Sequence, residues 1–407
     1  MIKTLKNPTA KGVIKAIASK SEVHRYLLCA ALADKKTDIL CEELNEDIIA
    51  TVSCLNALGA EITYKDNYFS VLPIKQVKEE PLLPCNESGS TLRFLLPTVS
   101  SFGKNAVFEA RGRLGSRPLS PLKEELQRTG AQIISENGRI TVSGKCTGTA
   151  FSIPGNVSSQ FISGLMLMLT KTGGEIKITE SIESLPYIEM TIKALRDFGC
   201  DVSFSDNTVN VPKTNPLLSP QNITSSGDWS NAAFFITLGI IGSSPVTVTG
   251  LDIKSAQGDK AVIDVLKSLG GDIRINGNEV TAYPSVLNAC DIDAKNIPDL
   301  VPVLSVAATK AEGTTRIYNC SRLRIKESDR IEAVRKMISA LGGKIHIEDD
   351  DIIIKGSPLT GGTVDSCNDH RIAMSAAVAA FISEDTVTIN GAEAVNKSYP
   401  TFWEEIK

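Results

Sequence analysis

The residues best suited to chemistry are basic side chains at the expected starts of apolar helices. A helix N-terminus carries partial positive charge, so it favours anions over cations. Cations that recur there make sense when an anionic ligand lies between the side chains and the backbone N–H groups. Any one of them alone is typical of a solvated surface charge, so the hypothesis rests on their joint occurrence. The motifs are Ser19-Lys20-Ser21-x-x-x-Arg25, Ser88-Gly89-Ser90-Thr91-Leu92-Arg93 and Asp369-His370-Arg371.

Further cations extend this pattern. Lys326 and Arg330 stand four residues apart, a like-charge spacing that destabilises an isolated helix by a few tenths of a kcal/mol. Arg117 precedes a proline, and Lys397 precedes Ser398. Without these eight cations the net charge of −4 would fall to −12, so we expect a focused positive site in an acidic protein. The eight are Lys20, Arg25, Arg93, Arg117, Lys326, Arg330, Arg371 and Lys397.

Several uncharged and acidic side chains accompany the cations, and each has two interpretations. The run Ser158-Ser159-Gln160 before an apolar segment fits a helix N-cap or a site for phosphate and sugar oxygens. Ser184 and Tyr187 beside a proline are typical of a turn, although their hydroxyls could bind a ligand. Asp299 and Glu327 are either salt-bridge partners or a general acid and base, and the sequence leaves both possibilities open.

A repeated phrase predicts the elements that position these residues. An amphipathic helix, a glycine and a short β-branched strand recur with glycines at 59, 130, 199, 270 and 342, which are 71, 69, 71 and 72 residues apart. A unit of about 70 residues cannot bury its own core, so we expect three units to pack into each of two α/β domains. The N-terminal strand should complete a truncated sixth unit. The predicted domains are residues 17–226 and residues 1–16 with 227–407.

Length and composition limit the class of protein. A chain of 407 residues exceeds what one core usually supports. The net charge of −4 argues against a general nucleic-acid binder, and no apolar run is long enough for a signal peptide or a membrane span. The nine cysteines show no C-x-x-C spacing and there are only three histidines, so we expect reduced thiols, no metal site and a cytoplasmic location.

The number and order of these motifs resemble the 5-enolpyruvylshikimate-3-phosphate synthase (EPSP synthase) family. The resemblance implies an α/β (α+β) fold of two pseudo-threefold domains. Each would hold three βαβαββ units in an inside-out α/β barrel, with the active site in the interdomain cleft. The matching blocks are Ser19–Arg25, Ser88–Arg93, Arg117-Pro118, Ser158–Phe161, Ile297–Asp299, Leu323–Arg330, Asp369–Met374 and Lys397–Pro400.

The resemblance also assigns residues to two substrates. Shikimate 3-phosphate would contact Lys20, Ser21, Arg25, Ser158, Ser159, Gln160, Ser184, Tyr187, Asp299 and Lys326. Phosphoenolpyruvate would contact Lys20, Gly89, Arg93, Arg117, Gln160, Arg330, Arg371 and Lys397, with Glu87, Ser88 and His370 as further candidates. Glu87 stands where the family often has an asparagine.

The implied reaction moves the enolpyruvyl group of phosphoenolpyruvate to the 5-hydroxyl of shikimate 3-phosphate, through a tetrahedral intermediate. Asp299 would help to remove the hydroxyl proton, Glu327 would protonate the methylene carbon, and Lys20 would complete the catalytic set. The reaction belongs to the shikimate pathway, which leads to chorismate and the aromatic amino acids. It requires no cofactor, and we expect a monomer without nucleic-acid or membrane partners.

Two alternatives remain. The first is the enolpyruvyl transferase that acts on UDP-N-acetylglucosamine, whose family usually carries a reactive cysteine five residues before the arginine; here that position is Gly112. The second is an inactive binding protein on the same fold, which would be expected to lose some of the cations, Asp299 or Glu327. None of these residues is missing.

Overall fold

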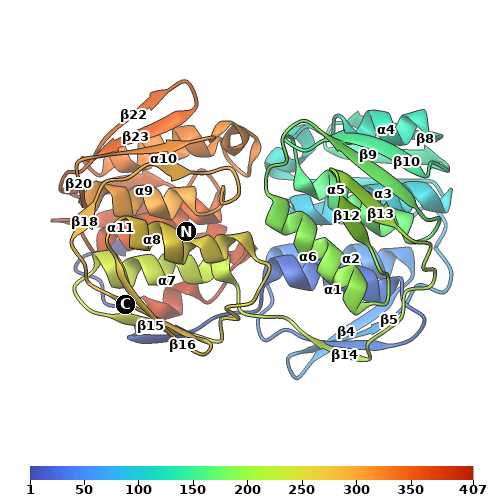
Figure 1. The fold of residues 1–407 in the computed structure, drawn as a ribbon, viewed down its shortest axis with the longest axis horizontal. Helices are drawn as coiled ribbons and strands as arrows, with labels where there is room; N and C mark the ends of the chain where they lie inside the picture. Colours follow the sequence, from blue (N-terminus) through green and yellow to red (C-terminus); the bar gives the residue numbers. More distant parts are fainter. Residues whose placement is uncertain (407) are drawn as a thin grey trace. The chain divides into compact units, whose positions relative to one another are not determined.

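The chain divides into two units that share no strand. The computed structural model describes residues 1–406. One unit, here called the continuous unit, is Ala18–Ser225; the other, the split unit, joins Met1–Ile17 to the chain from Ser226 onward. Figure 1 labels many of the elements of both units. Each unit is described by itself below.

The continuous unit contains three repeats of helices and strands. Its first repeat is α1 (Lys20–Ala31), β3 (Thr37–Leu40), α2 (Glu46–Leu58), β4 (Glu61–Lys65) and β5 (Tyr68–Leu72), with β14 (Asn222–Thr224). The second is β6 (Leu82–Asn86), α3 (Gly89–Phe102), β7 (Ala106–Ala110), the 3-10 helix η1 (Gly112–Ser116), α4 (Leu122–Arg128), β8 (Ala131–Glu136) and β9 (Arg139–Gly144). The third is β10 (Ala150–Pro154), α5 (Ser159–Leu169), β11 (Gly174–Thr179), α6 (Leu185–Asp197), β12 (Ser203–Ser205) and β13 (Thr208–Val211).

Each repeat of the continuous unit forms one four-stranded sheet with the same pairing. The orders are β14-β3-β5-β4, β6-β7-β9-β8 and β10-β11-β13-β12. In each sheet the first two strands are parallel, and the last two form an antiparallel hairpin. Alternating burial along β5 and β9 leaves one face of each strand for the core.

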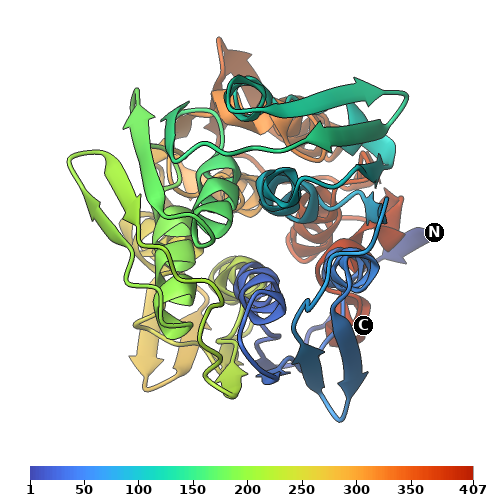
Figure 2. The same ribbon diagram turned by 90° about the vertical axis from the view of Figure 1, so that its right-hand side faces the viewer.

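Three helices form the buried centre of the continuous unit. Figure 2 shows α1 (blue), α3 (teal) and α5 (green) nearly end-on, with strands around them. Twelve of the 14 residues of α3 are buried, as expected for a helix enclosed on all sides. The Ser19–Arg25, Ser88–Arg93 and Ser158–Phe161 motifs occupy the N-terminal ends of these helices.

The split unit repeats the pattern. Its first repeat is β2 (Val13–Lys15), α7 (Trp229–Ile241), β15 (Val246–Thr249), η2 (Gly258–Ala261), α8 (Val262–Ser268), β16 (Asp272–Asn276) and β17 (Glu279–Tyr283). After β18 (Leu287–Asn288), the second is β19 (Ile292–Asp293), α9 (Val301–Lys310), β20 (Ala311–Glu312), β21 (Thr314–Tyr318), η3 (Ser321–Ile325), α10 (Arg330–Ala340), β22 (Lys344–Glu348) and β23 (Asp351–Lys355). The third is β24 (Gly362–Asp365), α11 (His370–Ala380), β25 (Val387–Asn390), η4 (Ala392–Lys397) and α12 (Phe402–Glu405), with β1 (Ile2–Leu5).

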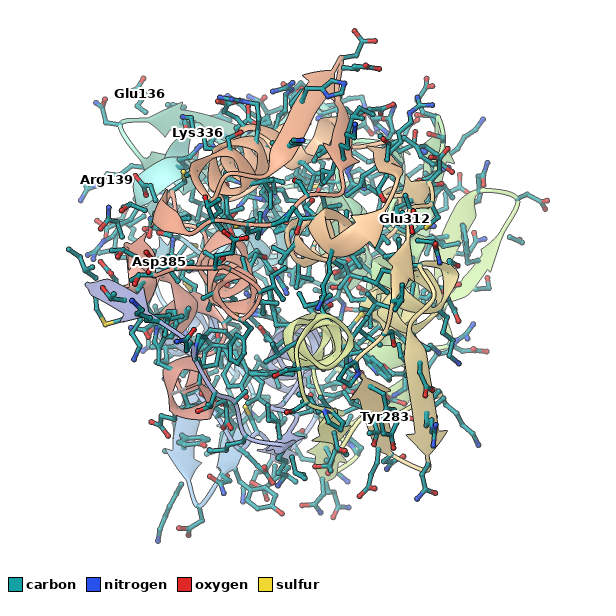
Figure 3. The ribbon with its side chains drawn as sticks, turned by 90° about the vertical axis from the view of Figure 1, so that its left-hand side faces the viewer. Glu136, Arg139, Tyr283, Glu312, Lys336 and Asp385 are labelled. Atoms are coloured by element: carbon teal, nitrogen blue, oxygen red, sulfur yellow. The ribbon has the colours of Figure 1, made fainter. Side chains whose placement is uncertain are left out.

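The N-terminal segment supplies two strands to the split unit. β1 pairs antiparallel with β25, and β2 pairs parallel with β15. The helices α7, α9 and α11 are buried along nearly their whole length. Figure 3 views these helices nearly end-on, with Tyr283, Glu312, Lys336 and Asp385 labelled around them.

The repeated glycines end helices in the left-handed region, as the sequence predicts. Their φ angles lie between 77° and 117°. A side chain would also collide there, because a Cβ on Gly59 would lie 2.5 Å from the carbonyl oxygen of Gln76. The equivalent distance from Gly130 to the oxygen of Lys145 is 2.6 Å. Glycine is therefore required for both backbone angle and space. Over residues 1–406, no helix has the length and apolar character needed to cross a membrane.

Candidate active site

Arg25 on α1 is a buried cation held by neutral acceptors. Its Nε donates to Oγ1 of Thr191 over 2.7 Å, and its terminal nitrogens donate to the carbonyl oxygens of Ser21 and Tyr187 over 2.7 and 2.8 Å. Burial lowers the pKa of Arg25 to about 10, which leaves it charged at neutral pH. No carboxylate in the described part of the chain forms an ion pair with it. Glu22 opposes this pKa shift but forms no ion pair with Arg25. A buried charge without a paired counter-ion is costly, and a bound anion would relieve that cost.

Lys20 lies one turn earlier on the same helix. Its Nζ forms an ion pair with Oδ2 of Asp47, in the first turn of α2, at 2.8 Å. The helix begins at Lys20 itself, with Ser19 as the N-cap. Lys20 and Ser21 therefore both belong to the first turn of α1, where ligands meet unsatisfied backbone N–H groups.

A second group surrounds the start of α3. Nη1 of Arg93 donates to Oε1 of Gln160 over 3.0 Å, and Nε2 of Gln160 donates to Oγ of Ser90 over 3.0 Å. A Cβ on Gly89 would lie 2.9 Å from Nη1 of both Arg93 and Arg117. Two guanidinium groups thus flank the start of α3, where the first residue, Gly89, has no side chain. This arrangement suits a small anion.

The remaining polar candidates of the continuous unit lie at two further helix starts. Ser158 is the N-cap of α5, where its hydroxyl accepts from the N–H of Gln160, and Ser159 is the first helical residue. Ser184 precedes α6 in the left-handed region, with φ of 56°. The carbonyl of Tyr187, on the same helix, is one of the acceptors of Arg25, so the starts of α1 and α6 are directly connected.

In the split unit, Arg330 joins three carboxylates. Its Nη1 donates to Oδ1 of Asp299 over 2.6 Å, its Nη2 to Oε2 of Glu327 over 2.7 Å, and its Nε to Oδ2 of Asp369 over 2.8 Å. Arg330 is 1% exposed. Lys326 also approaches Asp299, at 3.7 Å. The structure therefore brings together both carboxylates that the sequence singled out. Asp299, Glu327, Lys326, Arg330 and Asp369 are called the Arg330 cluster below.

The charges of the Arg330 cluster shift one another's pKa values. Burial by itself raises the pKa of Asp299, but Lys326, Arg371 and Arg330 outweigh it and hold that pKa well below 3.8. Burial, with Arg322 and Arg330 adding to it, lowers the pKa of Lys326 to about 8, although Asp299 opposes the shift. Within the cluster, Asp299 is thus an ionised carboxylate among cations, and one of these cations, Lys326, loses its proton near physiological pH.

The start of α11 adjoins this cluster. Nη2 of Arg371 lies 3.5 Å from Oδ2 of Asp299, and Asp369 is the N-cap of the helix. His370 is the first helical residue, 3% exposed, with Nδ1 at 4.0 Å from Asp369. Nζ of Lys397 donates to the carbonyl oxygen of Asn368 over 2.7 Å, which places it at the same helix start.

Three of the eight cations, Arg117, Lys326 and Lys397, do not belong to the N-terminal part of a helix as the pattern predicts. Lys326 and Arg330 do not share a helix face, because η3 ends at Lys326 in extended backbone and α10 begins at Arg330. The expected like-charge helix pair is therefore wrong, and the carboxylates around Arg330 offset the repulsion. Arg117 follows η1, and Lys397 ends η4, so both stand at the ends of 3-10 helices.

Comparison with known proteins identifies the family. The family model described as EPSP synthase (3-phosphoshikimate 1-carboxyvinyltransferase) matches residues 6–406. The chain belongs to the EPSP synthase family. A Clostridium acetobutylicum protein named 3-phosphoshikimate 1-carboxyvinyltransferase is 40% identical, over 98% of this chain and 94% of that protein.

Solved structures agree with the family. The EPSP synthase of Acinetobacter baumannii aligns with a TM-score of 0.80 at 27% identity, over 100% of this chain and 99% of that one. The enolpyruvyl transferase NikO of Streptomyces tendae also aligns at 0.80, over 100% of this chain and 98% of that one. Because NikO is only 20% identical to this chain, this alignment shows a shared fold and nothing about function. The mixed helix-and-strand fold is that of EPSP synthases.

Several residues in this member of the EPSP synthase family were not among the predicted site residues. Asp369 could have been found, since it begins the Asp-His-Arg motif. No sequence motif marks Asp259. Its Oδ2 accepts a hydrogen bond from the hydroxyl of Ser230, and the carbonyl of Ser230 accepts one from Nη1 of Arg371 over 2.9 Å. Burial, and then Asp299, raise the pKa of Asp259 to about 7. The contact of Thr191 with Arg25 could not be predicted from the sequence, because the two residues are 166 positions apart.

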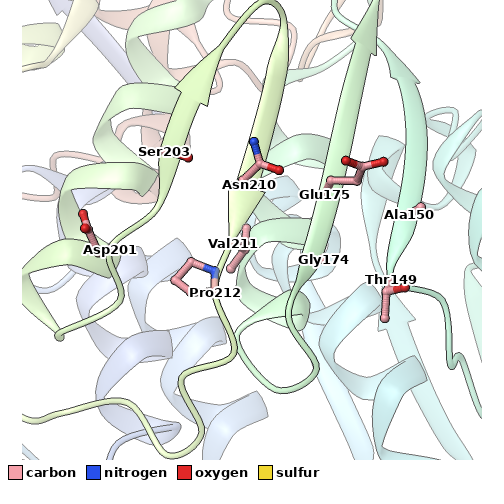
Figure 4. Close-up of a pocket in the computed structure, with 9 residues that line it drawn as sticks. All are labelled: Thr149, Ala150, Gly174, Glu175, Asp201, Ser203, Asn210, Val211 and Pro212. Atoms are coloured by element: carbon pink, nitrogen blue, oxygen red, sulfur yellow. The ribbon is translucent and has the colours of Figure 1, made fainter.

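A hollow on the third sheet of the continuous unit is unsuited to the substrates of the EPSP synthase family. It holds about 550 Å³ between β10, β11 and the β12–β13 hairpin, as Figure 4 shows. Its charged lining residues are Glu175 and Asp201, which would repel phosphate, and none of the predicted site residues lines it. Within residues 1–406, no three His, Cys, Asp or Glu side chains are grouped to hold a metal ion.

Proposed function

We propose that this chain transfers the enolpyruvyl group of phosphoenolpyruvate to the 5-hydroxyl of shikimate 3-phosphate. The products are 5-enolpyruvylshikimate 3-phosphate and inorganic phosphate. The observation that carries the proposal is the Arg330 cluster, in a chain whose relatives bear the name of this activity. Asp299 and Glu327, the two candidate proton carriers, both bind one buried guanidinium. The reaction belongs to the shikimate pathway, toward chorismate and the aromatic amino acids.

Shikimate 3-phosphate is the larger substrate, and its proposed ligands are mostly on the continuous unit. Arg25 is the strongest candidate, because it is buried without a carboxylate partner in the described residues. Its hydrogen bonds to Ser21 and Tyr187 fix its direction. The full proposed set is Lys20, Ser21, Arg25, Ser158, Ser159, Gln160, Ser184, Tyr187, Asp299 and Lys326.

Phosphoenolpyruvate carries a phosphate and a carboxylate on a small frame, so it needs several cations. The pair Arg93 and Arg117 beside Gly89 supplies two guanidinium groups within reach of one helix start. Planar guanidinium groups bind phosphate and carboxylate by paired hydrogen bonds. The full proposed set is Lys20, Gly89, Arg93, Arg117, Gln160, Arg330, Arg371 and Lys397, with Glu87, Ser88 and His370 as additional members. That the sets of both units meet at one cleft stays a prediction.

Asp299 and Glu327 have the proposed proton-transfer roles, with Lys20 as the third catalytic residue. Asp299 is a weak base, because its cationic neighbours hold its pKa well below 3.8. Bound phosphate and carboxylate groups would share those cations, which raises the pKa of Asp299 and makes it a better base. Binding of both substrates thereby activates the carboxylate that must accept the hydroxyl proton.

The chemical steps balance without any further reactant. The 5-hydroxyl gives its proton to Asp299 and its oxygen forms a bond to C2 of phosphoenolpyruvate, while Glu327 delivers a proton to the methylene carbon. The bond between C2 and the phosphate oxygen then breaks, so that the tetrahedral intermediate loses inorganic phosphate. A proton of the new methyl group returns to the protein. The cations stabilise negative charge throughout, which is electrostatic catalysis by preorganised groups. We place the reaction in the cytoplasm, in a monomer without a cofactor.

A phosphate-release assay tests the proposal. Phosphoenolpyruvate is offered with shikimate 3-phosphate, with UDP-N-acetylglucosamine, or alone. The proposal predicts release that requires shikimate 3-phosphate. Release only with the nucleotide sugar would favour the related transferase, and no release with either acceptor would favour a binding protein.

A further inference from the structure

Four buried side chains form a line of hydrogen bonds from α1 to the start of α3. His24 Nδ1 lies 2.7 Å from Oγ1 of Thr51 on α2, which lies 2.6 Å from Oγ1 of Thr91. Thr91 in turn donates to Oγ of Ser88, the N-cap of α3, over 2.7 Å. All four are at most 1% exposed. The helix α2 packs against both α1 and α3, so the line, here called the relay, crosses three helices.

The hydrogen bond from Thr91 to Ser88 sets the direction of the whole relay. Each threonine hydroxyl has a single hydrogen. Thr91 gives its hydrogen to Ser88, so its oxygen must accept from Thr51. The hydrogen of Thr51 is thereby used, so Thr51 must accept from Nδ1 of His24. The imidazole therefore carries its hydrogen on Nδ1, and every bond points toward Ser88.

This direction leaves the hydrogen of Ser88 available. The Ser88 oxygen accepts twice from Thr91, from its hydroxyl and from its backbone N–H at 3.4 Å. Both lone pairs are thus occupied, and no acceptor for the Ser88 hydrogen is found in residues 1–406. The hydroxyl stands at a helix N-terminus, next to Gly89 and its two flanking guanidinium groups. An anion bound there would be its acceptor.

We propose that His24 is a positioning residue, which fixes the relay so that Ser88 donates its hydroxyl hydrogen to an anionic oxygen of phosphoenolpyruvate. This inference rests on the proposed function. If the imidazole carried its hydrogen on the other nitrogen, Thr51 would donate to His24 and the whole line would reverse. Ser88 would then give its hydrogen to Thr91 and present only a lone pair to the substrate. A lone pair facing an anion is repulsive.

The surroundings of His24 keep its role constant with pH. Burial, and then Lys20 and Arg25, hold the pKa of His24 well below 6.5, so the ring is neutral at physiological pH. Its Nε2 is buried without a hydrogen-bond partner among the described residues, in agreement with a hydrogen on Nδ1. A protonated ring would also donate from Nδ1, so the direction of the relay survives acidification.

Two pairs of variants test the relay by steady-state kinetics with both substrates. Thr51→Val removes the hydroxyl at constant shape, whereas Thr51→Ser keeps it. His24→Leu removes the donor, whereas His24→Asn keeps an N–H at the position of Nδ1. We expect T51V and H24L to raise the KM for phosphoenolpyruvate about tenfold, the lower end of the scale for one lost hydrogen bond to a charged group. The KM for shikimate 3-phosphate and kcat should change less than about twofold. T51S and H24N should resemble the wild type.

A double variant separates positioning from packing. In a Ser88→Ala background the relay has no hydroxyl to direct, so adding Thr51→Val should leave the KM for phosphoenolpyruvate unchanged. An equal rise in both backgrounds, equal rises of both KM values, or a wild-type KM in T51V and H24L would overturn the proposal while the transferase activity stands. A wild-type chain without any turnover of phosphoenolpyruvate would overturn both the activity and the relay.

Discussion

Arg330 and Asp369 form a buried ion pair, with Nε of the arginine 2.8 Å from Oδ2 of the aspartate. Asp369 is 0% exposed and also accepts from the hydroxyl of Ser328 and the backbone N–H of Arg371. One carboxylate thus anchors the guanidinium of α10 and caps α11. The pair fixes Arg330 in the direction from which it reaches Asp299 and Glu327.

Replacing Asp369 by Asn should destabilise the chain strongly. The amide can still cap α11, but Arg330 loses its most buried counter-charge, and breaking such a pair costs roughly 3 kcal/mol. Urea unfolding measures the change. The control is Asp351→Asn, which breaks the pair with the exposed Arg316 and should cost much less, because solvent screens that pair. Equal costs for the two variants would show that burial of the Arg330 pair is energetically unimportant.

Replacing Glu327 by Gln should reduce turnover while substrate binding persists. A lost general acid lowers kcat by at least about tenfold. Phosphate release measures kcat, and thermal stabilisation by shikimate 3-phosphate measures binding. Glu332→Gln is the matched control, because Glu332 lies on α10 but pairs with Arg335. Unchanged phosphate release in E327Q would refute the role assigned to Glu327.

Lys326 should set the alkaline limit of activity. Its pKa is lowered to about 8, so the side chain is a cation below pH 8 and neutral above it. If that cation binds substrate, kcat/KM should fall about tenfold per pH unit above pH 8. Lys326→Arg keeps the charge to much higher pH, because a guanidinium group loses its proton only far above pH 8, and should abolish this fall in kcat/KM. If kcat/KM of K326R still falls above pH 8 as in the wild type, the fall is caused by the titration of another group.

Gly89→Ala should weaken binding of phosphoenolpyruvate selectively. The added methyl would lie 2.9 Å from the terminal nitrogens of Arg93 and Arg117, so both guanidinium groups must move. Since these are the ends of flexible side chains, stability should change little, but the KM for phosphoenolpyruvate should rise about tenfold. Gly12→Ala, which meets no atom within 4 Å, is the control. Equal rises of both KM values would place Gly89 outside the phosphoenolpyruvate site.

The local features of the fold could be predicted from the sequence, because they depend on residues close along the chain. The glycines after α2 and α4 have the positive φ angles that the repeat requires. Ser158 caps α5, as its position before an apolar run indicates. The sequence also singles out the residues of the Arg330 cluster, apart from Asp369, which stands in a predicted helix-start motif without an assigned role.

The contacts between distant segments could not be predicted. Thr191 binds Arg25, and Thr51 binds His24, only because helices from different parts of the sequence pack together. Their residue types carry no sign of this role. The raised pKa of Asp259 likewise depends on burial, which the sequence around it does not indicate. The helical pairing expected of Lys326 and Arg330 failed because a turn separates them.

The central claim is that this chain makes a carbon–oxygen bond between two anionic substrates and expels phosphate. The most direct measurement follows phosphoenolpyruvate labelled with 13C at C2 by NMR, with the chain and shikimate 3-phosphate. We predict a new enol-ether carbon signal and an equal amount of inorganic phosphate, with the phosphate of shikimate 3-phosphate retained. Pyruvate in place of the enol ether, or phosphate release without shikimate 3-phosphate, would contradict the claim.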